Sequence, residues 1–96
     1  MAAPLDATLV PRLQVGVRLR YDRHSGRYLL LSPERGLLLN ESAAQIARGC
    51  DGKRPIHELV LQLVDAGVPE QRAHEHVCGL LSELVARGLI GLQARP

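Results

Sequence analysis

LLLSPERGLLLN, residues 29–40, places two apolar triplets on either side of a segment of turn residues. Short apolar runs that are separated by Ser, Pro, Glu, Arg and Gly predict two strands that return on each other as a hairpin. Asn40 follows the second triplet directly, and its side chain can cap a helix that begins near Glu41. The centre of the chain is therefore predicted to be a strand hairpin that leads into a helix.

The sequence before this hairpin predicts one more strand. From Val15 to Tyr21, apolar and polar residues alternate, which is typical of a half-buried strand. DRHSG, residues 22–26, has the composition of a turn, so residues 15–21, 27–31 and 37–39 are expected to form a three-stranded antiparallel meander. Residues 1–10 contain Pro4 and no useful period. We expect a flexible N-terminal segment there and a single domain over residues 11–92.

Three helices are predicted after the hairpin. The first runs from Glu41 to about Gly49, and the second starts with Pro55 at its first helical position and ends at Gly67. The third starts at Pro69-Glu70 and runs to Gly88, and residues 89–92 can add a last short strand. The predicted fold class is α+β, a small three-stranded antiparallel sheet followed by three helices in a winged helix-turn-helix-like arrangement.

Composition narrows the class of protein. The chain has 96 residues, of which 46% are hydrophobic and 23% charged, so it can build one globular core. Its apolar runs are far shorter than the ~20 residues that span a bilayer, and we expect a cytoplasmic protein with no membrane contact. Cys50 and Cys78 are isolated from each other and are expected to be free thiols.

The usual signatures of catalysis and of metal binding are missing from the sequence. His74, His76 and Cys78 are close in sequence, but only His74 and Cys78 share a helical face, which is too few ligands for zinc. Ser42, His57 and Asp65 could form a triad in name only, because no nucleophile elbow surrounds the serine. No phosphate-binding glycine loop is present. We therefore expect no enzyme activity, no metal and no cofactor.

Nucleic acid is the runner-up partner, because a small sheet with three helices is compatible with a winged helix. The second predicted helix has acidic residues and no Lys or Arg, and the third has three Glu against two Arg. That charge is the wrong sign for a recognition helix. Six arginines lie between Arg12 and Arg35, but charged residues on the solvent face of a strand are ordinary. We expect no nucleic acid, with DNA binding kept as an alternative.

The two leucine triplets give the sheet more apolar surface than one face needs. Side chains alternate along a strand, so both faces of the predicted sheet carry leucine. Either the helices and the N-terminal segment cover everything, or the third strand is an open edge. An open edge presents unpaired N–H and C=O groups that an added peptide can satisfy. It can also pair with a second copy, so we expect a monomer or a homodimer.

Several blocks of this sequence resemble one family. RLRYD (18–22), LLLSPE (29–34), LLLNESAAQI (37–46) and CDGKRPIHELV (50–60) are similar to the coenzyme pyrroloquinoline quinone (PQQ) synthesis protein D family, and the similarity extends over about residues 11–92. The resemblance implies a peptide chaperone that binds the ribosomal precursor peptide of PQQ. It also implies a radical S-adenosylmethionine (SAM) enzyme as partner, which cross-links a Glu and a Tyr of that peptide.

Related domains recognise leader peptides in other pathways of ribosomally made, modified peptides, and this remains the alternative. Carried onto this chain, the resemblance and the open edge together predict a peptide site with the third strand on one side and the third helix on the other. Asn40 and the Asp51-Gly52 turn are expected to be mainly structural. The predicted peptide-binding residues are Gly36, Leu37, Leu38, Leu39, Asn40, Val77, Leu80 and Leu84.

Overall fold

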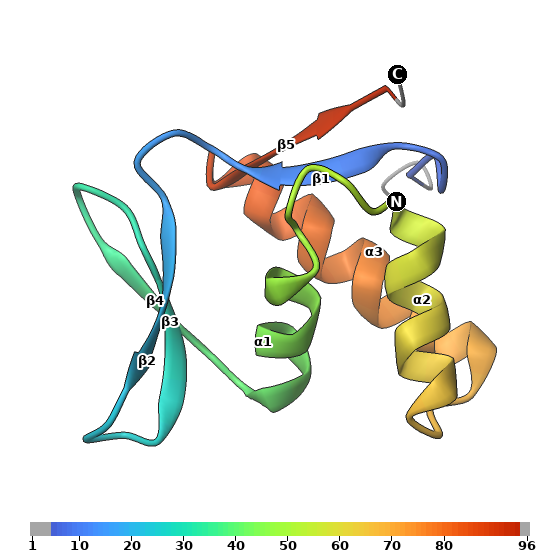
Figure 1. The fold of residues 1–96 in the computed structure, drawn as a ribbon, viewed down its shortest axis with the longest axis horizontal. Helices are drawn as coiled ribbons and strands as arrows, with labels where there is room; N and C mark the ends of the chain where they lie inside the picture. The colour runs from blue at the N-terminus through green and yellow to red at the C-terminus, as the bar shows by residue number, and fades with distance from the viewer. Residues whose placement is uncertain (1–4, 95–96) are drawn as a thin grey trace.

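The computed structural model describes residues 5–94 and contains five strands and three helices. In chain order they are β1 (Val10–Leu13), β2 (Arg18–Asp22), β3 (Arg27–Leu31), β4 (Gly36–Leu39), α1 (Glu41–Arg48), α2 (Ile56–Asp65), α3 (Glu70–Ala86) and β5 (Ile90–Gln93). A three-stranded sheet forms one end of the molecule and the helices form the other, with a two-stranded ribbon of β1 and β5 along one side (Figure 1). The predicted α+β class is confirmed.

The antiparallel meander β2-β3-β4 is also confirmed. Its first strand is shorter than predicted, because it starts at Arg18 and not at Val15. Gly16 has a φ of +85°, and the Val17 N–H donates to the Gln14 carbonyl at 3.0 Å, so the chain turns there. Val15 is 98% exposed as a result. The alternating pattern predicted the strand but not the turn that directly precedes it.

The β1–β5 ribbon changes the expected role of the N-terminal part of the chain. The short last strand was predicted, but its partner β1 was not, and the predicted domain boundary at residue 11 falls inside β1. Leu5 and Leu9 pack against the core, and the Leu9 carbonyl accepts from the Ile56 N–H at 2.9 Å. Residues 5–10 are therefore packed where a flexible segment was expected, and residues 1–4 of that segment lie outside the described part.

The three predicted helices are confirmed, with small differences at their starts. Asn40 caps α1, because its side-chain oxygen accepts from the Ala43 N–H at 2.8 Å. Pro55 and Pro69 each lie one residue before a helix and not at its first position. A proline has no backbone N–H, and a residue before the first helical position donates no hydrogen bond within the helix, so no helical hydrogen bond is lost there. Over residues 5–94, no helix combines the length and the apolar character needed to cross a membrane.

The core lies between the helices and one face of the sheet. Leu30 and Leu39 of the sheet are buried against the apolar residues of all three helices. At the end of the same face, the Arg48 guanidinium of α1 lies over the Tyr28 ring, 5.0 Å from its centroid. The opposite face is left uncovered, and its leucines do not belong to the core cluster. The helices therefore cover one of the two apolar faces that the sequence predicts.

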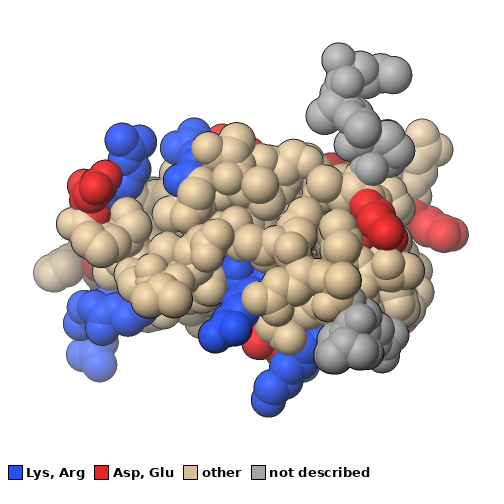
Figure 2. Space-filling view, turned by 90° about the horizontal axis from the view of Figure 1, so that it is seen from above, with Lys and Arg blue, Asp and Glu red and all other residues tan. Residues whose placement is uncertain are grey.

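Charge is distributed unevenly over this fold. The sheet and its two turns, residues 18–39, carry five arginines and two acids. Figure 2 shows that several Lys and Arg side chains gather at the end of the molecule that the sheet forms. The whole chain has a net charge of only +2, so the sheet is the basic part of a nearly neutral protein.

Candidate functional site

Strand β4 is an edge of its sheet. It pairs with β3 on one side, and among the described residues no strand pairs with the other side. The Ser32 N–H donates to the Arg35 carbonyl at 2.9 Å, which makes these two residues a hydrogen-bonded pair. Hydrogen-bonded and non-bonded pairs alternate along antiparallel strands, so the backbone groups of Gly36 and Leu38 point to the free side. These groups are available to a further strand.

Helix α3 runs beside this edge, and a hollow lies at each end of β4. At the Asn40 end, a hollow of about 260 Å³ separates the start of α1 from α3. At the Gly36 end, a hollow of about 490 Å³ lies between the β3–β4 turn and the end of α3. The hollow at the Gly36 end includes residues of β4 and α3, and the hollow at the Asn40 end includes the N-cap of α1 and residues of α3. We call this surface, from Asn40 to Gly36 along β4 and from His76 to Arg87 along α3, the β4–α3 groove.

The α3 residues of the two hollows form one stripe of the helix. They are His76, Gly79, Leu80, Glu83, Ala86 and the C-cap residue Arg87, with Glu75 next to His76. Their spacings of three and four residues place them on one side of the helix. The stripe is about 16 Å long at 1.5 Å per residue, and the five residues from Gly36 to Asn40 are about as long at 3.3 Å per residue. An extended segment of about five residues therefore matches the groove.

Gly79 lies in the middle of α3 and on this stripe. A glycine inside a helix costs about 0.5–1 kcal/mol relative to alanine. A Cβ at this position would meet nothing within 4 Å, so no internal contact requires a glycine. Gly79 is exposed and lines the hollow beside Leu80. A backbone without a side chain at this point allows an external chain to approach the helix closely.

The structure brings some of the predicted peptide-binding residues together and separates others. Gly36, Leu37 and Asn40 line the groove hollows, and so does Leu80 of α3. Asn40 also keeps its expected role as helix cap. The other four have their side chains elsewhere: Leu39, Val77 and Leu84 are buried in the core, and Leu38 is 47% exposed on the uncovered face of the sheet.

Burial changes what these four residues can do. Val77 and Leu84 are fully buried, so they hold α3 against the core and present no surface to a ligand in the free protein. Sequence reasoning placed them on the groove because a helical stripe of apolar residues does not say which of its edges is exposed. The prediction missed His76, Gly79 and Glu83, which lie on the exposed side of α3 next to the buried stripe. The unexplained glycine inside a helix was the signal that could have found them.

The groove carries a charged pair at the turn of α3 between its two hollows. An oxygen of Glu83 accepts from Arg87 at 2.9 Å, four residues along the helix. Both side chains are about half exposed, so this pair adds little to stability. The hollow at the Asn40 end is lined by Glu75 and Glu83 of α3, and the hollow at the Gly36 end by Arg87, the C-cap of that helix. A polar or charged side chain of a ligand could be accepted at either end.

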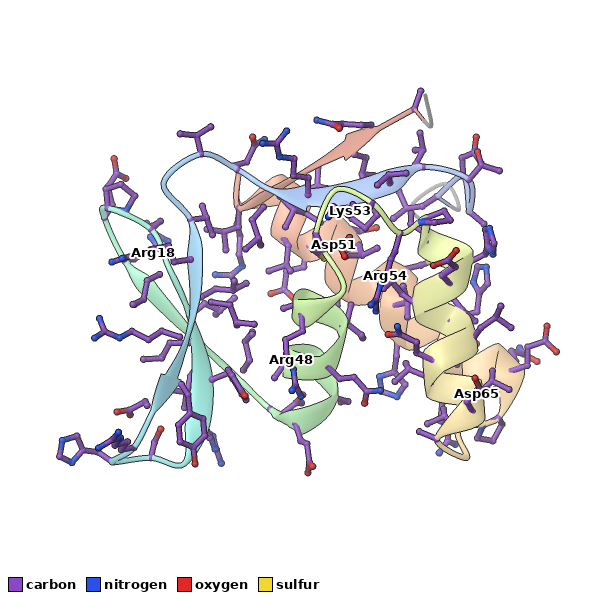
Figure 3. The ribbon with its side chains drawn as sticks, viewed as in Figure 1. Arg18, Arg48, Asp51, Lys53, Arg54 and Asp65 are labelled. Atoms are coloured by element: carbon purple, nitrogen blue, oxygen red, sulfur yellow. The ribbon has the colours of Figure 1, made fainter. Side chains whose placement is uncertain are left out.

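A second polar cluster lies at the turn between α1 and α2 and ties this turn to β1. The Asp51 carboxylate accepts from the backbone N–H groups of Lys53 and Arg54 at 2.9 and 3.1 Å, and the Arg54 side chain lies 3.6 Å away. Figure 3 shows these three residues together in the turn. Gly52 has a φ of +78°, and its N–H donates to the Pro11 carbonyl at 3.0 Å. The turn is structural, as the sequence predicted.

These contacts set the pKa of Asp51. Partial burial raises the pKa, but the two N–H donors and the charge of Arg54 outweigh it, so the pKa of Asp51 is lower than its ordinary value. Asp51 is therefore an ionised turn-stabilising group at neutral pH. It lies away from the β4–α3 groove, on another part of the surface.

The other reactive side chains considered in the sequence lie at several places in the fold. Both cysteines are free, and burial raises the pKa of the Cys50 thiol to about 12. His74 Nδ1 and Cys78 Sγ are 3.5 Å apart, but within residues 5–94 no three metal-ligating side chains lie close enough to hold an ion. His57 and Asp65 lie in the first and last turns of α2, about 12 Å apart along the helix, too far for a triad.

Comparison with known proteins places this fold in one family. The sequence model of the family described as coenzyme PQQ synthesis protein D matches residues 27–90. A PqqA binding protein from Gluconobacter oxydans is 32% identical over 76 residues, which cover 78% of this chain and 79% of that protein. A PqqA binding protein from Xanthomonas oryzae pv. oryzae is 42% identical over 53 residues, which cover 55% of this chain and 58% of that protein.

A solved structure supports the same assignment. It is the solution NMR structure of the PqqD truncation of Methylobacterium extorquens PqqCD, described as a stand-alone recognition element for ribosomally synthesised and post-translationally modified peptides. The TM-score is 0.74 at 26% identity, and the likeness covers 85% of this chain and 88% of that one. Family match, relatives and fold agree, and the chain therefore belongs to the coenzyme PQQ synthesis protein D family.

Proposed function

We propose that this chain is a cytoplasmic, non-catalytic adaptor that binds the PQQ precursor peptide by strand addition at β4. It presents the peptide to a radical SAM enzyme, which cross-links a Glu and a Tyr of that peptide. The observation that carries this proposal is the free edge of β4 with its outward backbone groups, facing a helix stripe of matching length. The family match and the relatives named PqqA binding protein support it.

The binding mode combines backbone pairing with side-chain pockets. A strand at β4 gains hydrogen bonds from the groups of Gly36 and Leu38, which give affinity that does not depend on sequence. Alternate side chains of the peptide then face the helices, where the two hollows accept them. Those hollows supply the selectivity. Gly79 leaves room for the peptide against α3.

An NMR titration tests the function and the site together. Isotope-labelled protein is titrated with a synthetic PQQ precursor peptide, and the backbone amide shifts are followed. Saturable shifts should centre on residues 36–40 and on the groove stripe of α3. Shifts that saturate elsewhere would contradict the site. If this peptide gives no shifts, the first replacement is a leader peptide of another modified-peptide pathway, and the second is duplex DNA.

Replacing Leu38 by proline gives a sharper test of strand addition. The Leu38 N–H points to the free side, so proline removes a group that pairs with the peptide and not one that pairs with β3. The loss of one hydrogen bond and the bulk of the ring at the edge should weaken peptide binding by about tenfold or more.

Leu38→Ala is the matched control, because it removes the side chain and keeps the N–H. The Leu38 side chain faces away from the groove and can contact only the outward side chains of the peptide, so we expect a loss of affinity of no more than about fivefold. Circular dichroism must show the same fold for both variants. Equal binding by the proline and alanine variants would contradict strand addition at β4.

A further inference from the structure

The uncovered face of the three-stranded sheet carries leucines and arginines in adjoining rows. We use the name outer face for the central part of this surface, Arg18, Arg20, Leu29, Leu31 and Leu38. The pair Asp22–Arg27 continues the same face toward the β2–β3 turn, and Gly36 continues it at the other end. Leu38 is 47% exposed, and Leu29 and Leu31 are half-buried. None of these three leucines belongs to the core cluster or packs against it. On the inner face, by contrast, Leu30 and Leu39 belong to the cluster, and Leu19, Tyr28 and Leu37 pack against it. The outer face is therefore apolar surface that this chain leaves open.

The register of the sheet makes the leucines one patch. Leu29 is the direct cross-strand partner of Leu38 and, on its other side, of Arg20. Leu31 lies two residues from Leu29 on the same face, and its cross-strand partner is Arg18. The solvent face of an antiparallel sheet is normally polar, so one exposed leucine adjoining two half-buried ones outside the core indicates an interaction surface.

The arginines on this face are free to bind a partner. Among residues 5–94, the two ion pairs join Arg54 to Asp51 and Arg87 to Glu83, so neither Arg18 nor Arg20 has a carboxylate within 4 Å. Arg20 and Arg23 line one hollow together with Leu29 and Leu31. Asp22 is the carboxylate of this hollow, and its oxygens accept from the backbone N–H groups of His24 and Ser25. Figure 3 shows Arg18 on the sheet, at the opposite end of the molecule from α2. A partner that fits here has apolar residues next to carboxylates.

We propose that the outer face docks the enzyme that modifies the bound peptide, through an acidic and apolar patch of that enzyme. This inference rests on the proposed strand addition at β4. A peptide strand on β4 extends the sheet, and every second side chain of the peptide then lies on the outer face next to Leu38. An enzyme on this face contacts the adaptor and the outward side chains of its peptide at the same time.

Other occupants fit this surface less well. A second copy of the chain would bring the arginine-rich face against itself, and like charges disfavour such a pair. A nucleic acid gains affinity from phosphate contacts along its length, but apart from Arg27 at the start of β3 the side chains of β3 and β4 on this face are leucines. An acidic protein surface uses both the arginines and the leucines.

Charge reversal on β2 tests the proposal without touching the peptide edge. Arg18→Glu with Arg20→Glu alters the strand farthest from β4, so the groove keeps its residues. The probe is the radical SAM enzyme of PQQ biosynthesis, kept anaerobic and titrated by calorimetry into protein loaded with the precursor peptide. We expect at least a tenfold loss of enzyme affinity and less than a twofold change in peptide affinity.

The matched control is Lys53→Glu with Arg72→Glu, which makes the same change in net charge. Both residues are exposed, and they lie in the α1–α2 turn and at the start of α3, outside the outer face. Enzyme affinity should change less than twofold in this control. Arg18→Gln with Arg20→Gln, which removes charge and keeps most of the side-chain length, should give an intermediate loss.

The outcomes separate this inference from the proposed function. If the reversed variant binds peptide normally and the enzyme equally well, the inference is overturned and the adaptor function stands. If no variant, including the unmodified protein, binds peptide, the proposed function fails, and docking of the extended sheet fails with it. Loss of a homodimer, of duplex DNA binding or of binding to anionic vesicles in the reversed variant, with enzyme affinity unchanged, would also overturn the inference.

Discussion

Gly79 is the residue at which stability and the proposed peptide binding oppose each other. Alanine is favoured over glycine in a helix, and the space around this position is open, so the fold itself would accept a Cβ. The groove would not accept it equally well, because the peptide has to pass between β4 and α3 at this level. A glycine that destabilises the helix and lies on the proposed peptide-binding surface is expected if the peptide passes close to α3 at this position.

We therefore expect Gly79→Ala to raise the free energy of unfolding by about 0.5–1 kcal/mol. The same substitution should weaken precursor-peptide binding several-fold, because the methyl group occupies the groove. Urea denaturation measures the first effect and the NMR titration the second. His74→Ala, on the same helix but outside the groove, is the control and should leave peptide affinity unchanged. A stabilised Gly79→Ala variant with full peptide affinity would contradict the placement of the peptide.

At the scale of elements, short segments depend on the turns that join them. β1 has four residues and is held to the α1–α2 turn by the Gly52 N–H and by an isolated bridge between Arg12 and Asp51. Asp51 organises that turn by accepting two backbone N–H groups. The ionised carboxylate makes the stronger acceptor, so the turn is coupled to pH.

This coupling has a definite sign. The pKa of Asp51 is lowered in the folded chain, so the stability from its ionised form is present above the ordinary pKa of about 3.9 and is lost as the pH falls through the lowered value. We expect Asp51→Asn to destabilise the protein at pH 7 by more than it does at pH 3. Chemical denaturation at both pH values measures this difference.

Asp6 and Asp22 also have lowered pKa values, because side-chain and backbone donors stabilise their ionised forms. These two residues are present in the unmodified protein and in the Asp51→Asn variant. The comparison of Asp51→Asn with the unmodified protein therefore removes their contribution. An identical loss of stability by both proteins between pH 7 and pH 3 would show that Asp51 does not contribute.

At the scale of the whole molecule, the peptide should stabilise the fold by mass action. A ligand that binds only the folded state contributes about 2.7 kcal/mol at a concentration 100 times its dissociation constant. For a domain of this size we expect the midpoint of thermal unfolding to rise by about 10–20 °C. Differential scanning calorimetry at increasing peptide concentration measures the rise.

A scrambled peptide of the same composition and the Leu38→Pro variant serve as controls, and both should show a much smaller rise. A rise of equal size with the scrambled peptide would indicate nonspecific binding. The stabilisation follows from the peptide concentration and the dissociation constant, so it gives a second measure of the affinity found by the NMR titration.

Much of this fold was predictable because local signals agree with it. The turn residues between the two leucine triplets predicted the β3–β4 hairpin, and Asn40 predicted the start of α1. The spacing of apolar residues predicted the buried faces of α2 and α3. Family resemblance added the expectation of a peptide at the third strand of the sheet. Each of these signals lies within a few residues of the structure that it specifies.

Long-range packing decided the rest. β1 forms only because Ile90–Gln93 returns beside it, about 80 residues later, and nothing in VPRL by itself predicts that pairing. The leucines of β3 and β4 look alike in sequence, and only the docking of the helices on one face made Leu30 and Leu39 core and left Leu29 and Leu38 outside it. Local sequence determines periodicity and turns, but the face that is buried depends on elements that are distant in the chain.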